Sequence, residues 1–332
     1  MKREIVLSGI RSTGHLHLGN YYGALRNFIR MQEDYTCYFF IADLHSLTTH
    51  PNPGDFHTGV RTILAEYLAA GLDPEKSALY AQSDIPEISE LYVLLNMIAY
   101  KGELERTASF KEKVRKHPDN INAGLLTYPV LMASDILIHR ADYVPVGKDQ
   151  EQHLEITRVL ARRFNSLYLA EVFPEPKAFN FGADLVKVPG LDGSGKMGKS
   201  EGNGIYLCDD ESTIRKKVMR AVTDSGPTEP HSKMAEPVEN LFTLLKIVST
   251  PDVVQHFLDQ YNNCTIRYGD LKKQLAEDII RQTLPIKKRI DEIYNDNAYL
   301  RQVTTKGTER ARESAHATLK EVRRAVGFKT FL

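Results

Sequence analysis

The chain has 332 residues but no tryptophan and only three cysteines. The cysteines are odd in number and far apart, so they fit neither a disulfide framework nor a zinc site. No stretch approaches the roughly 20 apolar residues that a membrane-spanning helix needs. The N-terminus leads straight into a strand-like run, without the apolar core of a signal peptide. These absences favour a cytoplasmic protein.

An excess of charge of either sign is also absent. Lys and Arg total 43, Asp and Glu total 43, and the formal net charge is zero. A uniformly basic nucleic-acid-binding protein is therefore excluded, and any RNA binding must use a local patch. Basic residues gather around residues 111–117 and in the C-terminal residues 310–329. On charge alone, both are ordinary solvated surfaces.

The first half of the chain alternates between short apolar runs and amphipathic segments. Residues 4–9, 37–42 and 77–82 predict buried strands, and residues 56–71 and 87–99 predict helices. This alternation favours an α/β fold with a parallel sheet and crossover helices. Ligands of such sheets bind beyond the carboxyl ends of the strands.

The second half becomes helical. An apolar helix interrupted by Pro129 is predicted over residues 124–139, then a strand over 143–146 and a helix from Asp149 to Arg163 with Asp149 as its cap. Residues 173–203 are rich in Pro, Gly and Asp and predict a loop-rich hinge. Further helices are predicted over residues 212–221, 238–248, 251–260, 271–295 and 307–325.

Two segments contain the groups that hold a polyphosphate. The first, residues 8–20, reads Ser-Gly-Ile-Arg-Ser-Thr-Gly-His-Leu-His-Leu-Gly-Asn. Gly19-Asn20 opens a helix whose N-terminus favours anions, and His17 lies on the same face of its first turn as Asn20. A tight strand-to-helix turn with a Gly-Asn cap explains these residues equally well.

The second segment, residues 190–200, reads Gly-Leu-Asp-Gly-Ser-Gly-Lys-Met-Gly-Lys-Ser. Lys196 and Lys199 are suited to closing over negative charge that develops in a transition state. The segment also matches the start of a P-loop, which would indicate an unrelated nucleotide hydrolase. However, Met197 stands where a P-loop needs Ser or Thr to hold magnesium, so we interpret that match as accidental.

Together these segments resemble the signature motifs of class I aminoacyl-tRNA synthetases. Residues 17–20 look like the HIGH motif and residues 196–200 like the KMSKS loop. Along nearly its whole length the chain is similar to the bacterial tryptophanyl-tRNA synthetases, in the segments 102–106, 110–113, 124–129, 132–137, 144–150 and 221–225.

The resemblance implies a Rossmann-like catalytic domain over residues 1–204, with an insertion and dimer-interface region at about 100–170. A helical anticodon-binding domain over 205–300 and a C-terminal helix over 301–332 that packs back on the body would follow. The implied reaction joins L-tryptophan to ATP, giving tryptophanyl-adenylate and pyrophosphate, and then transfers tryptophan to the 3′ end of tRNA(Trp). Magnesium would bridge the ATP phosphates, and the implied assembly is a homodimer. No metal site of the protein itself is expected.

The resemblance also assigns residues to roles. The catalytic residues would hold the phosphates and stabilise the departing pyrophosphate: His17, Asn20, Lys113, Lys196, Lys199 and Ser200. ATP-binding positions are Arg11, Ser12, Thr13, Gly19, Asn20, Gly147, Lys148, Asp149, Val188, Lys196, Met197, Gly198, Lys199 and Ser200. Tryptophan-binding positions are His45, Tyr128, Met132, Asp135 and Gln150.

Asp135 stands on an otherwise apolar helix, where a carboxylate is costly unless it is paired. The resemblance implies that it accepts the indole N–H. From the pattern alone, an Asp135 paired with a group such as Arg140 is the better explanation. His45 follows the second strand, and a satisfied buried histidine explains it nearly as well as a ligand-binding one.

Two positions depart from the family pattern. Gly198 replaces the usual serine, which removes one hydroxyl from the phosphate grip and costs about 1 kcal/mol of transition-state binding. Arg11 stands where Gln is common and adds positive charge beside the nucleotide. Neither change removes a catalytic lysine, so an active enzyme is expected.

Two related alternatives stay open. Tyrosyl-tRNA synthetase shares the fold and both motifs, and Asp135 could accept a phenol O–H as readily as an indole N–H. The Met-Ala-Ser-Asp helix at 132–135 and the short helical C-terminal part favour tryptophan. A non-catalytic regulator that binds tryptophan or RNA is the other alternative, and the retained His17 and Lys199 argue against it.

Overall fold

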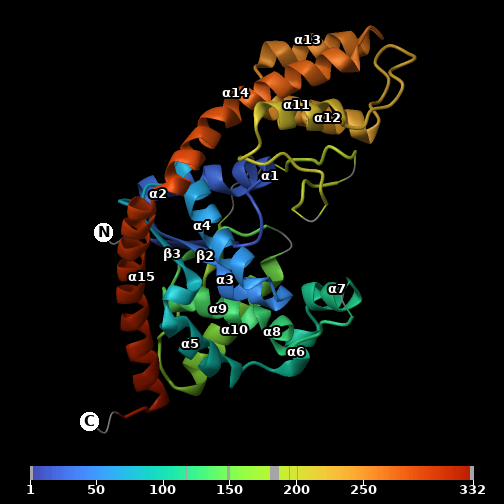
Figure 1. Ribbon diagram of the computed structural model, residues 1–332. Coiled ribbons are helices and arrows are strands. Elements are labelled where there is room, and N and C mark those ends of the chain that lie inside the picture. Colours follow the sequence, from blue (N-terminus) through green and yellow to red (C-terminus); the bar gives the residue numbers. More distant parts are fainter. Residues whose placement is uncertain are drawn as a thin grey trace.

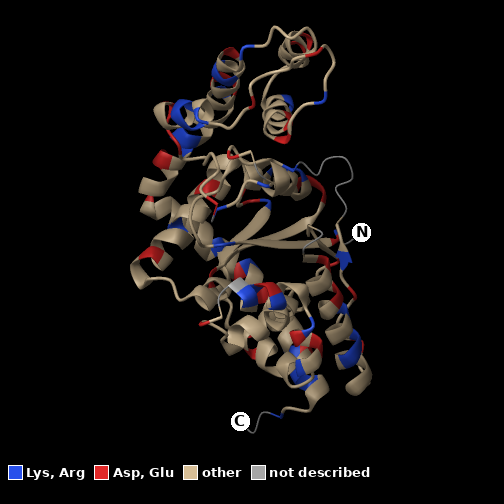
Figure 2. Ribbon diagram, turned by 90° about the vertical axis from the view of Figure 1, so that its right-hand side faces the viewer, with Lys and Arg blue, Asp and Glu red and all other residues tan. Residues whose placement is uncertain are grey.

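The computed structural model describes residues 3–116, 118–147, 150–179, 187–193, 195–199 and 201–329. Figure 1 shows a central α/β body, a separate group of helices above it and one long helix along its side. Lys, Arg, Asp and Glu are interspersed over all these parts (Figure 2), in keeping with a net charge of zero. In the described part of the chain, no helix is both long and apolar enough to cross a membrane.

The body is built on a parallel sheet of five strands in the order β3-β2-β1-β4-β5. The predicted α/β class and the first three predicted strands are confirmed. The fifth strand lies where the sequence predicted only a loop-rich hinge, because a two-residue strand is too short to show alternation. The strands are β1 (Ile5–Arg11), β2 (Thr36–Ala42), β3 (Ser77–Ala81), β4 (Tyr143–Val144) and β5 (Lys177–Ala178).

Helices cover both faces of the sheet. Successive side chains of β2 point to opposite faces, so that Phe39 and Ile41 join one apolar core and Tyr38 and Phe40 join the other. This explains why the β2 sequence is continuously apolar. The covering helices are α2 (Arg26–Asp34) and α4 (Pro53–Ala70) on the first face, and α5 (Pro86–Asn96), α9 (Tyr128–Ile138) and α10 (Glu151–Leu167) on the second.

The apolar segment predicted over residues 124–139 is divided in two, as its proline indicated. Pro129 lies in the first turn of α9, where its missing N–H costs no hydrogen bond. The predicted cap of α10, Asp149, lies outside the described residues. The remaining short elements are α1 (Leu18–Asn20), the π-helix η1 (Tyr21–Leu25), α3 (Asp43–Ser46), η2 (Leu47–Thr49), η3 (Gln82–Asp84), α6 (Lys101–Glu105), α7 (Ala108–Lys116) and α8 (Ala123–Leu126).

The second half of the chain forms the upper helices and the long side helix in Figure 1. The 28-residue helix α14 connects the upper group with the body, where the Tyr22 hydroxyl donates to Gln282 Oε1 at 2.8 Å. The predicted helices of this half are confirmed within a few residues, except that the last one begins ten residues earlier. They are α11 (Glu211–Met219), α12 (Glu236–Val248), α13 (Pro251–Asn262), α14 (Tyr268–Asn295) and α15 (Asn297–Val326).

Helix α15 covers the exposed edge of the sheet at β3. Gly307 allows this approach, because a Cβ atom there would lie 1.9 Å from the backbone oxygen of Leu79. Several basic residues of α15 pair with acidic residues of the body, including Arg323 with Glu90. Covering an edge strand in this way prevents pairing with another chain.

Candidate active site

The carboxyl ends of β1, β2 and β3 lie at one edge of the sheet, and polar residues follow each of them. Ser12 follows β1, and its backbone N–H donates to Ser46 Oγ at 3.2 Å in the helix after β2. Gln82 follows β3 and accepts from the backbone N–H of His45 at 3.3 Å. The sheet therefore brings together three loops at the edge where parallel α/β folds bind ligands.

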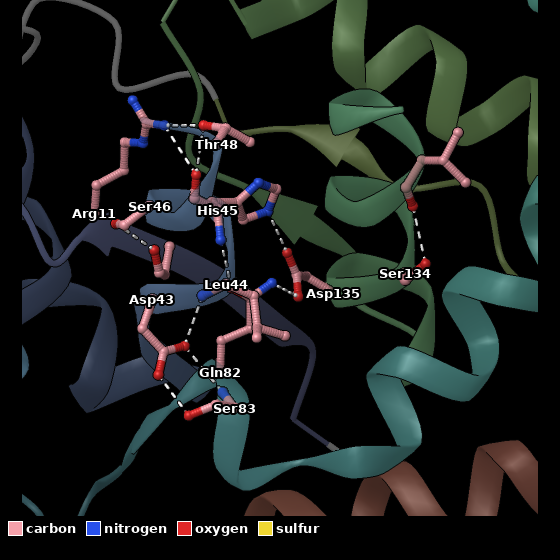
Figure 3. Close-up of polar contacts among 12 residues, drawn as sticks. Arg11, Asp43, Leu44, His45, Ser46, Thr48, Gln82, Ser83, Ser134 and Asp135 are labelled. Carbon is pink, nitrogen blue, oxygen red and sulfur yellow. Dashed lines mark hydrogen bonds and ion pairs between the residues drawn. The ribbon is translucent and has the colours of Figure 1, made fainter. Parts of the chain in front are cut away.

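Asp135 is the centre of a buried network at this edge (Figure 3). Its Oδ1 accepts from Gln82 Nε2 at 2.7 Å, and its Oδ2 lies 2.9 Å from His45 Nε2. Asp135 as a whole is 1% exposed. Burial raises the pKa of Asp135, while the hydrogen bond from His45 acts in the opposite direction. The network thus pairs a carboxylate that would otherwise be costly to bury.

The alternative pairing of Asp135 with Arg140 is wrong. Arg140 Nη2 instead lies 2.5 Å from Glu321 Oε2 on α15. The partners of Asp135 come from the ends of β2 and β3, which the linear pattern does not connect with α9. His45 is both satisfied and placed at the site, so the two interpretations of this histidine were not exclusive.

A cationic and aromatic cluster borders the network. The Tyr128 ring centroid lies 4.4 Å from that of His45, and Lys113 Nζ lies 4.6 Å from the Tyr128 centroid. Arg11 Nη2 donates to His45 O and to Thr48 Oγ1, both at 2.9 Å (Figure 3). Two buried polar atoms, Arg11 Nε and His45 Nδ1, have no hydrogen-bond partner among the described residues. A buried polar atom without a partner requires an explanation, and a bound ligand or water would supply the missing hydrogen bonds here.

The first motif forms the N-terminus of α1 through reciprocal hydrogen bonds between His17 and Asn20. The Asn20 backbone N–H donates to His17 Nδ1 at 3.3 Å, and the His17 N–H donates to Asn20 Oδ1 at 3.1 Å. The acceptors of both side chains are thereby used locally. The atoms that are left, His17 Nε2 and Asn20 Nδ2, are donors, so the cap interpretation and the phosphate-binding interpretation are compatible.

The charge state of His17 agrees with this geometry. Burial, together with the charges of Lys199 and Lys196, lowers the pKa of His17 to about 4. A neutral imidazole that accepts at Nδ1 carries its proton on Nε2. His17 is therefore a neutral hydrogen-bond donor at neutral pH.

The second motif is docked against the first. Lys199 Nζ donates to Thr13 O at 2.6 Å and to Gly14 O at 3.3 Å. Met197 attaches the loop to the body of the protein. Its side chain is buried, and its backbone N–H donates to Val188 O at 3.0 Å. The two motifs, far apart in the sequence, therefore meet in one site.

The cations of the site are held close together. Burial lowers the pKa of Lys199 to about 8, with Glu66 raising it and Arg11 lowering it. Burial also lowers the pKa of Lys113, and the charge of Arg11 contributes. Burial, together with the charge of Arg11, destabilises the protonated amines until an anion binds, which favours binding of a polyanion.

The remaining predicted residues fall into three groups. Lys196 is exposed on the loop, Val188 is buried beneath it, and Gly198 N donates to Asn203 Oδ1 at 3.1 Å. Met132 is half-buried on α9, and the Gln150 N–H donates to Gly147 O at 2.9 Å at the start of α10. The sequence also predicted Lys148, Asp149 and Ser200, which lie outside the described residues.

Sequence reasoning missed three residues that shape the site. Gln82 was assigned to the end of a strand, although a polar residue that directly follows a buried parallel strand is a recognisable signal. Ser46 carries no such signal, because its role arises from a long-range contact with Ser12. Asn203 contacts the nearby Gly198, but a single asparagine in a loop does not form a recognisable pattern.

A comparison with known protein families agrees with these features. The model of the family described as tRNA synthetases class I (W and Y) matches residues 1–283. The chain belongs to this family, and the predicted resemblance is confirmed.

Two relatives cover nearly the full chain. The tryptophan–tRNA ligase of Porphyromonas gingivalis is 66% identical over 326 residues, which are 98% of this chain and 100% of that protein. The tryptophan–tRNA ligase of Clostridium perfringens is 39% identical and covers 98% of each chain. Among solved structures, tryptophanyl-tRNA synthetase from Campylobacter jejuni complexed with ADP and tryptophan has a TM-score of 0.88 and 32% identity, covering 98% of this chain and 100% of that one.

Proposed function

We propose that the protein is a tryptophan–tRNA ligase, which activates L-tryptophan with ATP and transfers it to tRNA(Trp). The observation that carries this proposal is the contact between its two phosphate-binding segments, Lys199 with Thr13 and Gly14. The full-length relatives that are tryptophan–tRNA ligases support the choice of amino acid.

In the activation step, the tryptophan carboxylate attacks the α-phosphorus of ATP and pyrophosphate leaves. The protein contributes positioning and charge stabilisation. His17 Nε2 and Asn20 Nδ2 donate to phosphate oxygens at the N-terminus of α1. Lys199 and Lys196, with Lys113 from α7, stabilise the charge that accumulates on the leaving pyrophosphate. Magnesium enters bound to ATP as part of the substrate.

On the amino-acid side, Asp135 accepts the indole N–H. Both carboxylate oxygens already accept one hydrogen bond, but each has a second lone pair. Gln82 and His45 therefore fix the orientation of the carboxylate. Tyr128, Met132 and Gln150 complete the proposed tryptophan site.

Tyrosine and nucleotide hydrolysis are the competing functions. A tyrosine-specific enzyme would share the fold, and only substrate tests separate the two. The described part of residues 195–210 contains no helix, whereas a P-loop opens directly into one. That observation disfavours the hydrolase.

The wider proposals concern domains and partners. We propose domain boundaries near residues 204 and 300, with the helices up to residue 300 contacting the anticodon of tRNA(Trp) and α15 belonging to the body. A homodimer that uses the region of residues 100–170 and a cytoplasmic location are also proposed. Light scattering that gives a monomer mass at micromolar concentration would contradict the dimer.

The first experiment is amino-acid-dependent ATP–pyrophosphate exchange with tryptophan and with tyrosine. We expect exchange with tryptophan alone, weakened by Asp135→Asn, which keeps the shape but alters the hydrogen bonding of the side chain. The control is Asp252→Asn on the exposed start of α13, which should exchange normally. Exchange with tyrosine alone moves the assignment to the sister enzyme, and exchange with neither contradicts catalysis. Because the chain has no tryptophan, fluorescence separately reports whether tryptophan binds.

A further inference from the structure

A second cluster of reactive side chains lies beside the first motif. A ring nitrogen of His15, a carboxylate oxygen of Glu66 and Sγ of Cys208 all lie within 4.8 Å of one another. His15 precedes α1, Glu66 is on α4, and Cys208 follows the loop that carries Lys199. The proposed reaction uses none of these three side chains.

Their chemistry is that of a transition-metal site. Imidazole, carboxylate and thiolate are the side-chain groups that bind zinc, with bond lengths of about 2.0–2.3 Å. Ligand atoms on a tetrahedral ion of that size lie roughly 3.3–3.8 Å apart. His15 Nδ1 and Glu66 Oε1 are 2.7 Å apart, so small side-chain movements bring the three groups to the required spacing.

In this cluster, Glu66 is buried and His15 is accessible to solvent. Glu66 is fully buried, and its second oxygen accepts from the Leu16 N–H at 2.7 Å. This hydrogen bond holds the carboxylate in one orientation, as outer contacts of metal ligands do. The His15 side chain is 49% exposed and leaves a path from solvent.

We propose that His15, Glu66 and Cys208 bind one zinc-class divalent cation, with water in the fourth position. The sequence could not show this site, because a single cysteine joins a histidine and a glutamate from two distant segments. It departs from the expectation that the protein has no metal site of its own.

A cation here ties together the two segments that carry the motifs. The Leu207 N–H donates to Leu16 O at 2.8 Å and the Leu18 N–H donates to Ile205 O at 2.9 Å, so this strip already joins the first motif to the base of the loop. An ion bound to both Cys208 and His15 would link the same two segments a second time, through side chains. Metal binding therefore restrains the base of the loop.

The test uses cobalt(II) added to metal-free, reduced full-length protein. We expect one equivalent per chain, with the thiolate-to-cobalt charge-transfer band and intense visible bands of a tetrahedral site, and displacement of cobalt by zinc. Cys208→Ser should abolish the charge-transfer band. His15→Asn removes a ligand and should weaken binding by more than the roughly tenfold loss that follows from changing an outer contact of a ligand. Cys264→Ser, which changes an exposed cysteine elsewhere, should leave the spectrum unchanged.

The cobalt spectrum reports metal binding directly and does not depend on catalysis. Absence of a thiolate band at saturating cobalt, or a band that survives Cys208→Ser, overturns the proposal. A band lost equally in Cys264→Ser also overturns it. His15 is half-exposed and Cys208 is only partly buried, so both variants should fold, and circular dichroism checks this.

Discussion

The two halves of the proposed site are built differently. On the amino-acid side, Asp135, His45 and Gln82 are buried and hydrogen-bonded to one another between sheet and helix. On the nucleotide side, Lys199 reaches over the first motif from a glycine-rich loop, and Lys196 is exposed. The contrast agrees with the proposed roles, in which a buried network selects the amino acid and a loop supplies the positive charge that stabilises the transition state.

The largest expected effect comes from removing the loop charge. Lys199→Met keeps the length of the side chain but deletes the amine that contacts Thr13 and Gly14. By analogy with the loss of one preorganised donor, we expect pyrophosphate exchange to fall by about 10²–10³-fold. Tryptophan binding, followed by fluorescence, should change little. The exposed Lys246→Met on α12 is the control.

The pH dependence of pyrophosphate exchange tests the role of Lys199 on the nucleotide side. Since the pKa of Lys199 is about 8 in the ligand-free protein, its amine loses its proton as the pH rises through that value. Exchange measured at ATP concentrations below the KM should therefore decline on the alkaline side. Lys199→Arg keeps its charge, so its profile should stay flat there. On the acid side, His17 stays neutral down to about pH 4, so no loss of activity near pH 6.5 should arise from this residue. Parallel alkaline limbs in the wild type and Lys199→Arg would contradict the assignment.

Gln82→Leu disrupts the buried network on the amino-acid side of the proposed site. The variant leaves Asp135 Oδ1 and the His45 N–H without their partner in a buried place, at a cost of about 1–3 kcal/mol. We expect the KM for tryptophan to rise roughly 5- to 150-fold, while the KM for ATP stays near its original value. Gln255→Leu, on the exposed face of α13, is the control. An equal rise in both KM values would show that the two halves are not separate.

Sequence reasoning predicted these halves unequally, and for a physical reason. The strands, the helices and both motifs depend on local periodicity and on glycine, lysine and histidine at short spacing, and they were predicted from it. The pairing of Asp135 depends on which strand ends lie together, so the local pattern favoured Arg140 and overlooked Gln82. The sequence predicted that the two motifs lie together. It could not predict that Lys199 contacts the backbone carbonyl of Thr13.

The smallest expected effect comes from Gly198→Ser, which restores the serine that is usual in the family motif. Gly198 does not have a positive φ, and a Cβ atom there would lie 3.1 Å from Cγ of Glu201, a flexible side chain that can shift. The variant should therefore fold normally. One added hydroxyl contributes about 1 kcal/mol if it reaches the phosphates, so we expect exchange to rise by about fivefold. A rise in kcat with an unchanged KM for tryptophan places the gain on the loop side, whereas a fall shows that this loop depends on the mobility of its glycine.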